Sequence, residues 1–200
     1  MPKTTRDKII QAALSSFAAR GYDGTTLARI ARDVGIQKPS LYNHFSSKDE
    51  LFFTVAKKVM EELTEVMMTS ANLHQEKAVE DRIYLVLTDS TDFILQKHEG
   101  AMYKRFMLFP PAGIAEDLQI LNQAGDANID QLLMNFYEQG VNENVLNDCS
   151  FPVFRAGFYI LMDGLFTESF IYRDGDFQER FEGAWMVFWR GVSGVCPSPL

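Results

Sequence analysis

The stretch that decides the fold is residues 25–51, TTLARIARDVGIQKPSLYNHFSSKDEL. It holds two short segments separated by Gly35. In the first segment, apolar residues recur at the spacing of one helix face, namely Leu27, Ile30, Ala31 and Val34. Thr25 or Thr26 can cap its start, and Gly35 can end it, because glycine accepts the left-handed conformation of a helix C-terminus. The stretch therefore opens with a predicted helix of about two turns.

The second segment, residues 37–45, predicts another short helix. Pro39 fits the first turn of a helix, where the missing N–H is no loss. Leu41 and Phe45 stand four residues apart, so both would face a core. Two short helices joined by a tight turn form a helix-turn-helix, whose second helix enters the major groove of DNA.

Two longer helices flank this pair. Thr4 and Asp7 have the spacing of a capping box, and Gly21 ends the helix that they begin. Ser47 and Glu50 open the next helix in the same way. Its apolar face is formed by Leu51, Phe52, Val55, Val59 and Leu63.

The remainder of the sequence keeps the helical period and shows no strand alternation of useful length. Its predicted helices lie near residues 77–97, in a short segment stopped by Pro110, from 114 to 140, at 151–172 and at 177–193. The sequence therefore predicts an all-α fold of about nine helices. We expect a helix-turn-helix head at residues 1–48 and a larger helical body at 49–200.

Charge is distributed unevenly along the chain. The net charge of the 200 residues is −8. Residues 1–60 nevertheless carry ten Lys and Arg against five Asp and Glu, a net charge of +5, whereas the other 140 residues carry 9 against 22. A basic head on an acidic body is the pattern expected of a protein that neutralises phosphates with its head alone. Chance asymmetry is the alternative.

Several classes of protein fit the sequence poorly. No apolar run approaches the roughly 18 residues of a membrane span, and residues 1–7 lack the apolar core of a signal peptide. Cys149 and Cys196 are far apart and read as free thiols of a cytoplasmic protein. The three histidines lack metal-ligand spacing, and no catalytic or nucleotide motif is present. We therefore expect no enzyme activity, metal or cofactor.

The head resembles the tetracycline-repressor (TetR) family over about a quarter of the chain. The residues that carry the resemblance are Ile9, Ala12, Ala13, Phe17, Gly21, Tyr22, Thr25, Thr26, Ile30, Ala31, Val34, Gly35 and the run 41–51. The resemblance implies a DNA-binding head on a body that binds a small-molecule effector and forms a homodimer. It also implies a dimer interface of four helices, the last two from each subunit.

Four side chains of the second segment suit base recognition. Lys38 can donate to guanine or to a phosphate, and Ser40 and Asn43 are short polar residues that suit base edges or phosphates. Pro39 offers an apolar surface for a thymine methyl group. An ordinary solvated lysine is the alternative for Lys38.

Six further residues are expected to contact the DNA backbone. The resemblance implies phosphate contacts for Tyr42 and His44, and for Thr25, Thr26 and Arg29 near the start of the preceding helix. Lys48 stands at a helix N-terminus, where the helix dipole disfavours a cation, and a nearby phosphate would account for it. Tyr42 could instead belong partly to the core, and His44 and Lys48 could be solvated surface residues.

The body is rich in phenylalanine and methionine, which suits an adaptable apolar pocket between helices. The residues expected to line it are Met67, Phe93, Met102, Phe106, Phe136, Phe158, Met162 and Phe166. Plain core packing is the alternative for each of them. Segment 151–172 is apolar nearly all round, so we expect a buried helix that also serves the dimer. The expected interface residues are Phe154, Leu161, Leu165, Phe181, Trp185 and Phe188.

These expectations combine into one hypothesis. The chain would be a transcriptional repressor whose homodimer binds a palindromic operator in double-stranded DNA and leaves it when a small apolar or aromatic ligand binds. An activator or a regulator controlled by a protein partner would share the same head. A helical small-molecule carrier, or an α-helical enzyme, would be a different class of protein.

Overall fold

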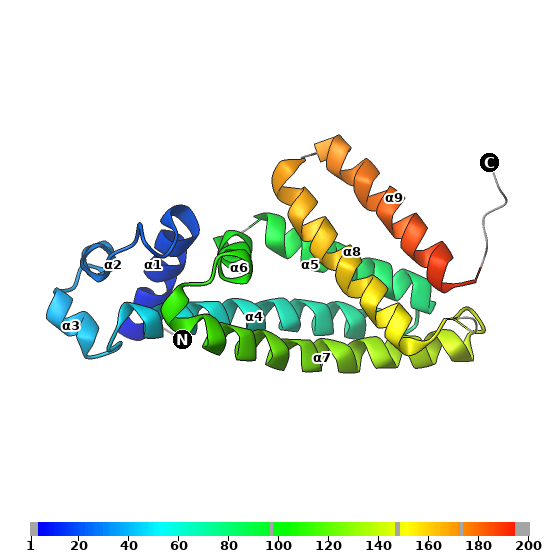
Figure 1. The fold of residues 1–200 in the computed structure, drawn as a ribbon, viewed down its shortest axis with the longest axis horizontal. Helices are drawn as coiled ribbons and strands as arrows, with labels where there is room; N and C mark the ends of the chain where they lie inside the picture. Colours follow the sequence, from blue (N-terminus) through cyan, green and yellow to red (C-terminus); the bar gives the residue numbers. More distant parts are fainter. Residues whose placement is uncertain (1–3, 97, 147–148, 173, 195–200) are drawn as a thin grey trace. The chain divides into compact units, whose positions relative to one another are not determined.

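The computed structural model describes residues 4–96, 98–146, 149–172 and 174–194 (Figure 1). Within them lie nine α-helices and no strand, which confirms the predicted all-α fold. The helices are α1 (Thr5–Arg20), α2 (Leu27–Val34), α3 (Lys38–Tyr42), α4 (Lys48–Leu73), α5 (Val79–Gln96), α6 (His98–Leu108), α7 (Ala115–Asn142), α8 (Phe151–Ile171) and α9 (Asp174–Val192), with a 3-10 turn at Ala112–Ile114 before α7. Cys149 is a buried free thiol, and Cys196 lies outside the described residues.

The chain divides into two compact units. Unit 1 comprises Met1–Leu63 and Gln96–Gly125, and unit 2 comprises Thr64–Leu95 and Asp126–Leu200. The boundaries therefore fall inside α4 and α7 rather than after residue 48. Unit 1 is larger than the predicted head because α6 packs extensively against α1 and thereby joins the head.

Hydrogen bonds confirm the predicted start of α1 and the predicted start and end of α2. The Thr4 hydroxyl accepts a bond from the Asp7 amide at 3.2 Å, and the Asp7 carboxylate accepts from the Thr4 amide at 2.9 Å, which completes the capping box. Thr26 is the residue that caps α2. Gly35 ends α2 in the left-handed conformation, with φ of 78°, which glycine adopts at no steric cost.

The core of the helix-turn-helix is aromatic and extends into α4. The Phe17 ring meets the Phe52 ring edge-on at a centroid distance of 4.9 Å, and Tyr22 meets Phe52 in the same way at 5.4 Å. Leu41 and Phe45 are buried, as their spacing predicted, and so is Ile30. Because a three-helix head has little apolar area of its own, its stability depends on the start of α4.

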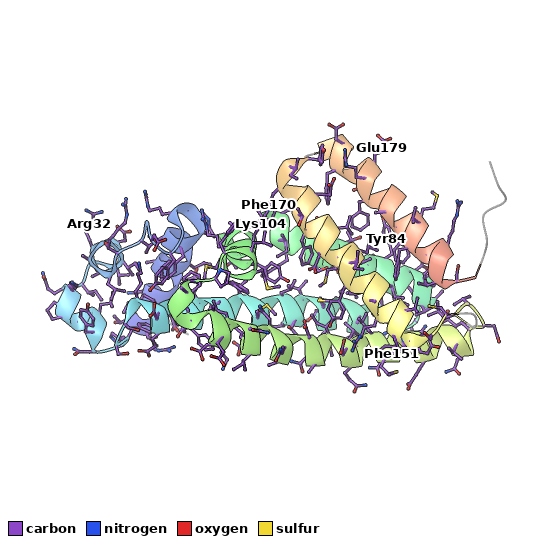
Figure 2. The ribbon with its side chains drawn as sticks, viewed as in Figure 1. Arg32, Tyr84, Lys104, Phe151, Phe170 and Glu179 are labelled. Atoms are coloured by element: carbon purple, nitrogen blue, oxygen red, sulfur yellow. The ribbon has the colours of Figure 1, made fainter. Side chains whose placement is uncertain are left out.

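In unit 2, α8 and α9 lie side by side (Figure 1). Tyr84 of α5, labelled in Figure 2, packs edge-on against Phe181 and Trp185 of α9, each at a centroid distance of 5.4 Å. The Phe154 ring of α8 lies 6.0 Å from the Phe188 ring of α9. Aromatic contacts therefore bind α5, α8 and α9 together inside this unit.

Candidate nucleic-acid interface

The outward side of α3 carries polar side chains. Lys38, Pro39, Ser40, Tyr42 and Asn43 are exposed, whereas Leu41 is fully buried. We call these five exposed residues the α3 surface. Within the described residues, none of their side chains takes part in a hydrogen bond, and the Lys38 ammonium lies 5.8 Å from the centroid of the Tyr42 ring. These donors and acceptors are therefore available to an external partner.

The start of α2 precedes the α3 surface in the sequence. Thr26 and Arg29, two of the residues expected to contact a phosphate, lie there. The Thr26 hydroxyl accepts a hydrogen bond from the Arg29 amide at 3.3 Å, and Thr26 is exposed. The Arg29 side chain is half-buried. A helix N-terminus with exposed N–H groups favours an anion, so this end of α2 suits a phosphate.

Thr25 does not fit its expected contact with a phosphate. Its side chain is fully buried, its hydroxyl donates to the Gly21 carbonyl at 2.9 Å, and the same oxygen lies 3.2 Å from the Ser16 hydroxyl. Its amide donates to the Tyr22 carbonyl. Every polar group that Thr25 could offer as a donor is thus used inside the head, and only Thr26 of this pair faces outward.

Lys48 has partners inside unit 1. Its ammonium donates to the carbonyls of Tyr22 and Thr25, at 3.0 and 3.3 Å, and lies 3.8 Å from the centroid of the Tyr22 ring. The unfavourable position of this cation at a helix N-terminus predicted a nearby phosphate. These internal acceptors account for the cation equally well, and one N–H of the ammonium remains for an external partner.

Tyr22 and Asp49 tie the turn between α1 and α2 to α4. The Tyr22 hydroxyl donates to the Asp49 carboxylate. Burial, together with this carboxylate, raises the pKa of Tyr22 to about 12, so the hydroxyl keeps its proton at physiological pH. Lys48, Asp49 and Tyr22 thus fix the position of the helix-turn-helix on the first turn of α4.

Gln37 is a candidate that the sequence reading missed. It is the exposed N-cap of α3, and its side chain makes no capping hydrogen bond. The first residues of a recognition helix contact base edges, and a free carboxamide can pair with adenine through two hydrogen bonds. Its position directly before Lys38 and Pro39 was the available signal.

The expected ligand-pocket residues are all buried, but they are divided between the two units. Met102 and Phe106 belong to unit 1, and the other six belong to unit 2. Among the described residues, no group of three or more His, Cys, Asp or Glu is arranged to hold a metal ion. None of the described helices combines the length and apolar character needed to cross a membrane.

The expected dimer-interface residues are not exposed in the subunit. All six are buried, with exposed fractions of 9% or less, because α8 and α9 use them to pack within unit 2. Their role in a dimer interface stays a prediction. Leu161, Leu165 and Phe188 reach the floor of a surface hollow, whereas Phe154, Phe181 and Trp185 do not.

That hollow lies along the exposed side of α8 and α9 and has a volume of about 700 Å³. Ile160 and Val187 are each 75% exposed beside it. The residues that form this side, here called the α8–α9 face, are Gly157, Ile160, Gly164, Gly183, Ala184 and Val187. A Cβ atom at Gly164 or Gly183 would meet no atom within 4 Å, so small residues leave the surface open there. Arg180 and Glu168 border it as an ion pair at 2.8 Å.

Comparisons with known proteins place this geometry among bacterial regulators. The model for bacterial regulatory proteins of the tetR family matches residues 9–55. The biofilm operon icaADBC HTH-type negative transcriptional regulator IcaR of Staphylococcus aureus is 31% identical over 137 residues, which are 67% of this chain and 70% of that protein. The Staphylococcus epidermidis IcaR is 49% identical over 47 residues, 24% of this chain and 25% of that protein.

Solved structures share the fold at lower identity. The fatty acid degradation regulator FadR from Bacillus halodurans superposes with a TM-score of 0.77 at 16% identity, covering 96% of this chain and 98% of that one. FadR from Bacillus subtilis, solved in complex with stearoyl-CoA, gives a TM-score of 0.73 at 18% identity, covering 94% and 98%. The likeness thus extends over nearly the whole chain.

Proposed function

Because the chain belongs to the TetR family of bacterial transcriptional regulators, we propose that it is a repressor that binds a palindromic operator as a two-fold dimer. The observation that carries the proposal is the α3 surface, whose polar side chains have no hydrogen-bond partner among the described residues. Repression is favoured because the relative that matches two thirds of the chain is a negative regulator. Such a protein would act in the cytoplasm, where the DNA is.

In this proposal the α3 surface reads bases. Lys38, Ser40 and Asn43 contact base edges, and Pro39 packs on a thymine methyl group. The Tyr42 hydroxyl and the His44 ring donate to phosphates. Tyr42 is 47% exposed, which leaves its hydroxyl accessible although its ring lies near Lys38.

The start of α2 supplies the remaining backbone contacts. Thr26 and Arg29 bind a phosphate at the helix N-terminus, where free N–H groups add to the attraction. Lys48 contributes its remaining N–H at most, because two carbonyls already hold its ammonium. These contacts set the register of α3 on the duplex without reading sequence.

The dimer forms in this proposal through the α8–α9 face. Ile160 and Val187 are large apolar side chains left exposed, and the glycines beside them allow close approach of a second backbone. Two copies related by a two-fold axis would present two α3 helices to successive major grooves, about 34–36 Å apart.

The ligand is expected to bind in unit 2. The six expected pocket residues in that unit are large and apolar, which suits a small apolar or aromatic molecule. A regulator of similar fold was solved with stearoyl-CoA, an apolar chain on a polar carrier. Release from DNA requires that the ligand bind one of two conformations more tightly than the other.

The test is selection of bound sites from random double-stranded DNA by the purified chain. A repressor of the proposed kind selects an inverted repeat, blocks transcription from a promoter that contains it, and releases it when an added probe such as palmitate or stearoyl-CoA binds. Activation of that promoter contradicts repression. Failure to retain any DNA at low salt contradicts DNA binding and favours a small-molecule carrier.

A further inference from the structure

Arg105, in the last turn of α6, reaches the C-terminal end of α1. Its Nε donates to the Ala18 carbonyl at 2.9 Å, and its Nη2 donates to the Ala19 carbonyl at 3.4 Å. Both ends of this contact lie in unit 1, 86 to 87 residues apart in the sequence. A side chain of α6 therefore holds the first helix of the head.

The carbonyls of Ala18 and Ala19 lie in the last turn of α1, where a helix provides no backbone N–H donor for them. The last four carbonyls of an α-helix have no intrahelical donor. The Gly21 amide satisfies Phe17 at 2.9 Å, but within the described residues no backbone N–H reaches Ala18 or Ala19. Ala18 is buried, so water cannot easily replace the guanidinium there. The positive charge also lies at the negative end of the α1 dipole.

The residue that follows α1 leaves space for this contact. Gly21 has φ of 72°, a conformation that favours glycine, and a Cβ atom built on it would stand 3.0 Å from Nη1 of Arg105. A larger residue would strain the backbone and crowd the guanidinium. The glycine therefore serves the Arg105 contact as well as the end of the helix.

The surface beside the contact is hollow rather than packed. A cavity of about 770 Å³ separates the turn Gly21–Asp23 from the segment Phe109–Gly113 that follows α6, and Arg105 lines it. Beside this hollow, Arg105 therefore adds a polar contact to the packing of α6 against α1.

We propose that Arg105 is a positioning residue for DNA binding, which fixes the orientation of the head on α6 without contacting DNA. The inference rests on the proposed function, since it assumes a dimer that binds two half-sites. Loss of the guanidinium adds freedom to α1, and through it to α2 and α3. Two heads that are less well oriented bind an operator more weakly and discriminate less between half-site spacings.

The test compares Arg105→Lys and Arg105→Gln with the unaltered protein. Lysine keeps the charge but cannot donate from Nε and Nη2 together. Lys57→Gln is the matched control for charge, because Lys57 is an exposed residue of the same unit whose partner is Glu61 on its own helix. Circular dichroism and melting temperature report whether each variant is folded.

Affinity is measured on the selected operator and on the same operator with one base pair inserted between the half-sites. The insertion moves one half-site by about 3.4 Å and turns it by about 34°. We expect both Arg105 variants to bind the normal operator about tenfold more weakly, comparable to the loss of one charged hydrogen bond. The ratio between the affinity for the normal operator and the affinity for the operator with the insertion should approach one. The salt dependence of binding should stay unchanged, because no phosphate contact is lost.

A role in stability alone would lower the melting temperature and the active fraction but leave the spacing ratio as it is in the unaltered protein. That result, or a similar change in Lys57→Gln, overturns the inference while the proposed function stands. An unaltered protein that selects no operator overturns the proposed function itself, and the inference with it.

Discussion

The α3 surface and the α8–α9 face are both exposed, yet they have opposite chemistry. The first consists mainly of polar and charged side chains on a helix of five residues and on the residue that follows it. It belongs to a unit in which Tyr22, Lys48 and Asp49 join the turn after α1 to α4. The second consists of glycine, alanine, isoleucine and valine on two long helices. A polar surface suits phosphates and bases, whereas exposed apolar side chains favour another protein surface. The two regions should therefore respond differently to salt and to protein concentration.

The largest effect is expected on the apolar side of this comparison. Ile160→Asp places a charge on the α8–α9 face, and burying that charge in a dimer would be unfavourable. The variant should be a folded monomer by analytical ultracentrifugation. Its affinity for a full operator should fall by at least about 100-fold, since one head loses the second as a tethered partner.

Ile120→Asp is the matched control. Ile120 is 59% exposed on α7 in unit 1, so the same substitution changes charge and exposed apolar area without touching the α8–α9 face. The control should remain dimeric and bind the operator normally. A dimer that persists in Ile160→Asp would place the interface elsewhere.

On the polar side, Lys38→Ala should reduce operator affinity by about tenfold and leave the dimer intact. If Lys38 binds a phosphate, the plot of log affinity against log salt loses about one unit of slope. If it binds guanine, the slope is unchanged and sequence preference relaxes at one position. Gel-shift titrations over a salt series distinguish the two.

The control for this substitution is Arg32→Ala. Arg32 projects from the surface of α2, where it forms an exposed pair with Asp33 (Figure 2). The Arg32→Ala substitution also removes one positive charge from the head, but at a position outside the α3 surface. Equal losses of affinity in the two variants would show that Lys38 acts through general charge and makes no specific contact.

The sequence predicted these two regions unequally well, for a physical reason. In the head, each element is marked by a local signal: the capping box at Thr4, the cap at Thr26, and the left-handed turn at Gly35. Such signals act within a few residues, so they can be read without the fold. The exposed side of α3 followed directly once Leu41 was assigned to the core.

The body offered no comparable signal. Segment 151–172 is apolar nearly all round. The spacing of its apolar residues therefore did not indicate which side packs within the subunit and which side remains exposed. The large residue Phe154 was expected at the dimer interface but is fully buried within the subunit, and the exposed side contains glycine and β-branched residues. The burial of Thr25 was missed for a related reason, since it depends on how the turn after α1 folds back onto Ser16 of α1.

Lys48, at the start of α4, is expected to contribute more to stability than to DNA binding. Lys48→Ala removes the donor to the Tyr22 and Thr25 carbonyls, so the free energy of unfolding should fall by about 1–2 kcal/mol. The salt dependence of DNA binding should stay unchanged. Urea denaturation measures the first quantity, and gel-shift titration measures the second.

Lys57→Ala provides the comparison for this effect. Its exposed i,i+4 pair with Glu61 should contribute less than about 0.5 kcal/mol to the same free energy. A loss of about one unit of salt slope in Lys48→Ala, without a loss of stability, would make Lys48 a phosphate contact instead.

The smallest expected effect concerns the carboxylates of Asp126 on α7 and Asp163 on α8, both in unit 2. Tyr159 donates to the Asp130 carboxylate at 3.0 Å, and Arg155 pairs with Asp130 at 2.9 Å, but no cation pairs with Asp163 among the described residues. Burial, followed by the charge of Asp126, raises the pKa of Asp163. Burial, followed by the charge of Asp130, raises that of Asp126. At neutral pH the ionised pair therefore opposes folding.

Asp163→Asn removes one charge of this pair and should raise stability at pH 7 by about 0.5 kcal/mol, a small value because the side chain keeps access to solvent. A pKa raised in the folded state means that the folded protein binds the proton more tightly than the unfolded chain. The cost of ionisation is thus complete above the folded pKa and disappears as pH falls through it towards the unfolded value. The gain of Asp163→Asn should shrink over the same range, measured by melting temperature from pH 7 to 4. Glu65→Gln, which removes a charge from an exposed position in the same unit, should give no such pH-dependent gain, and an equal gain in both variants would assign the effect to net charge.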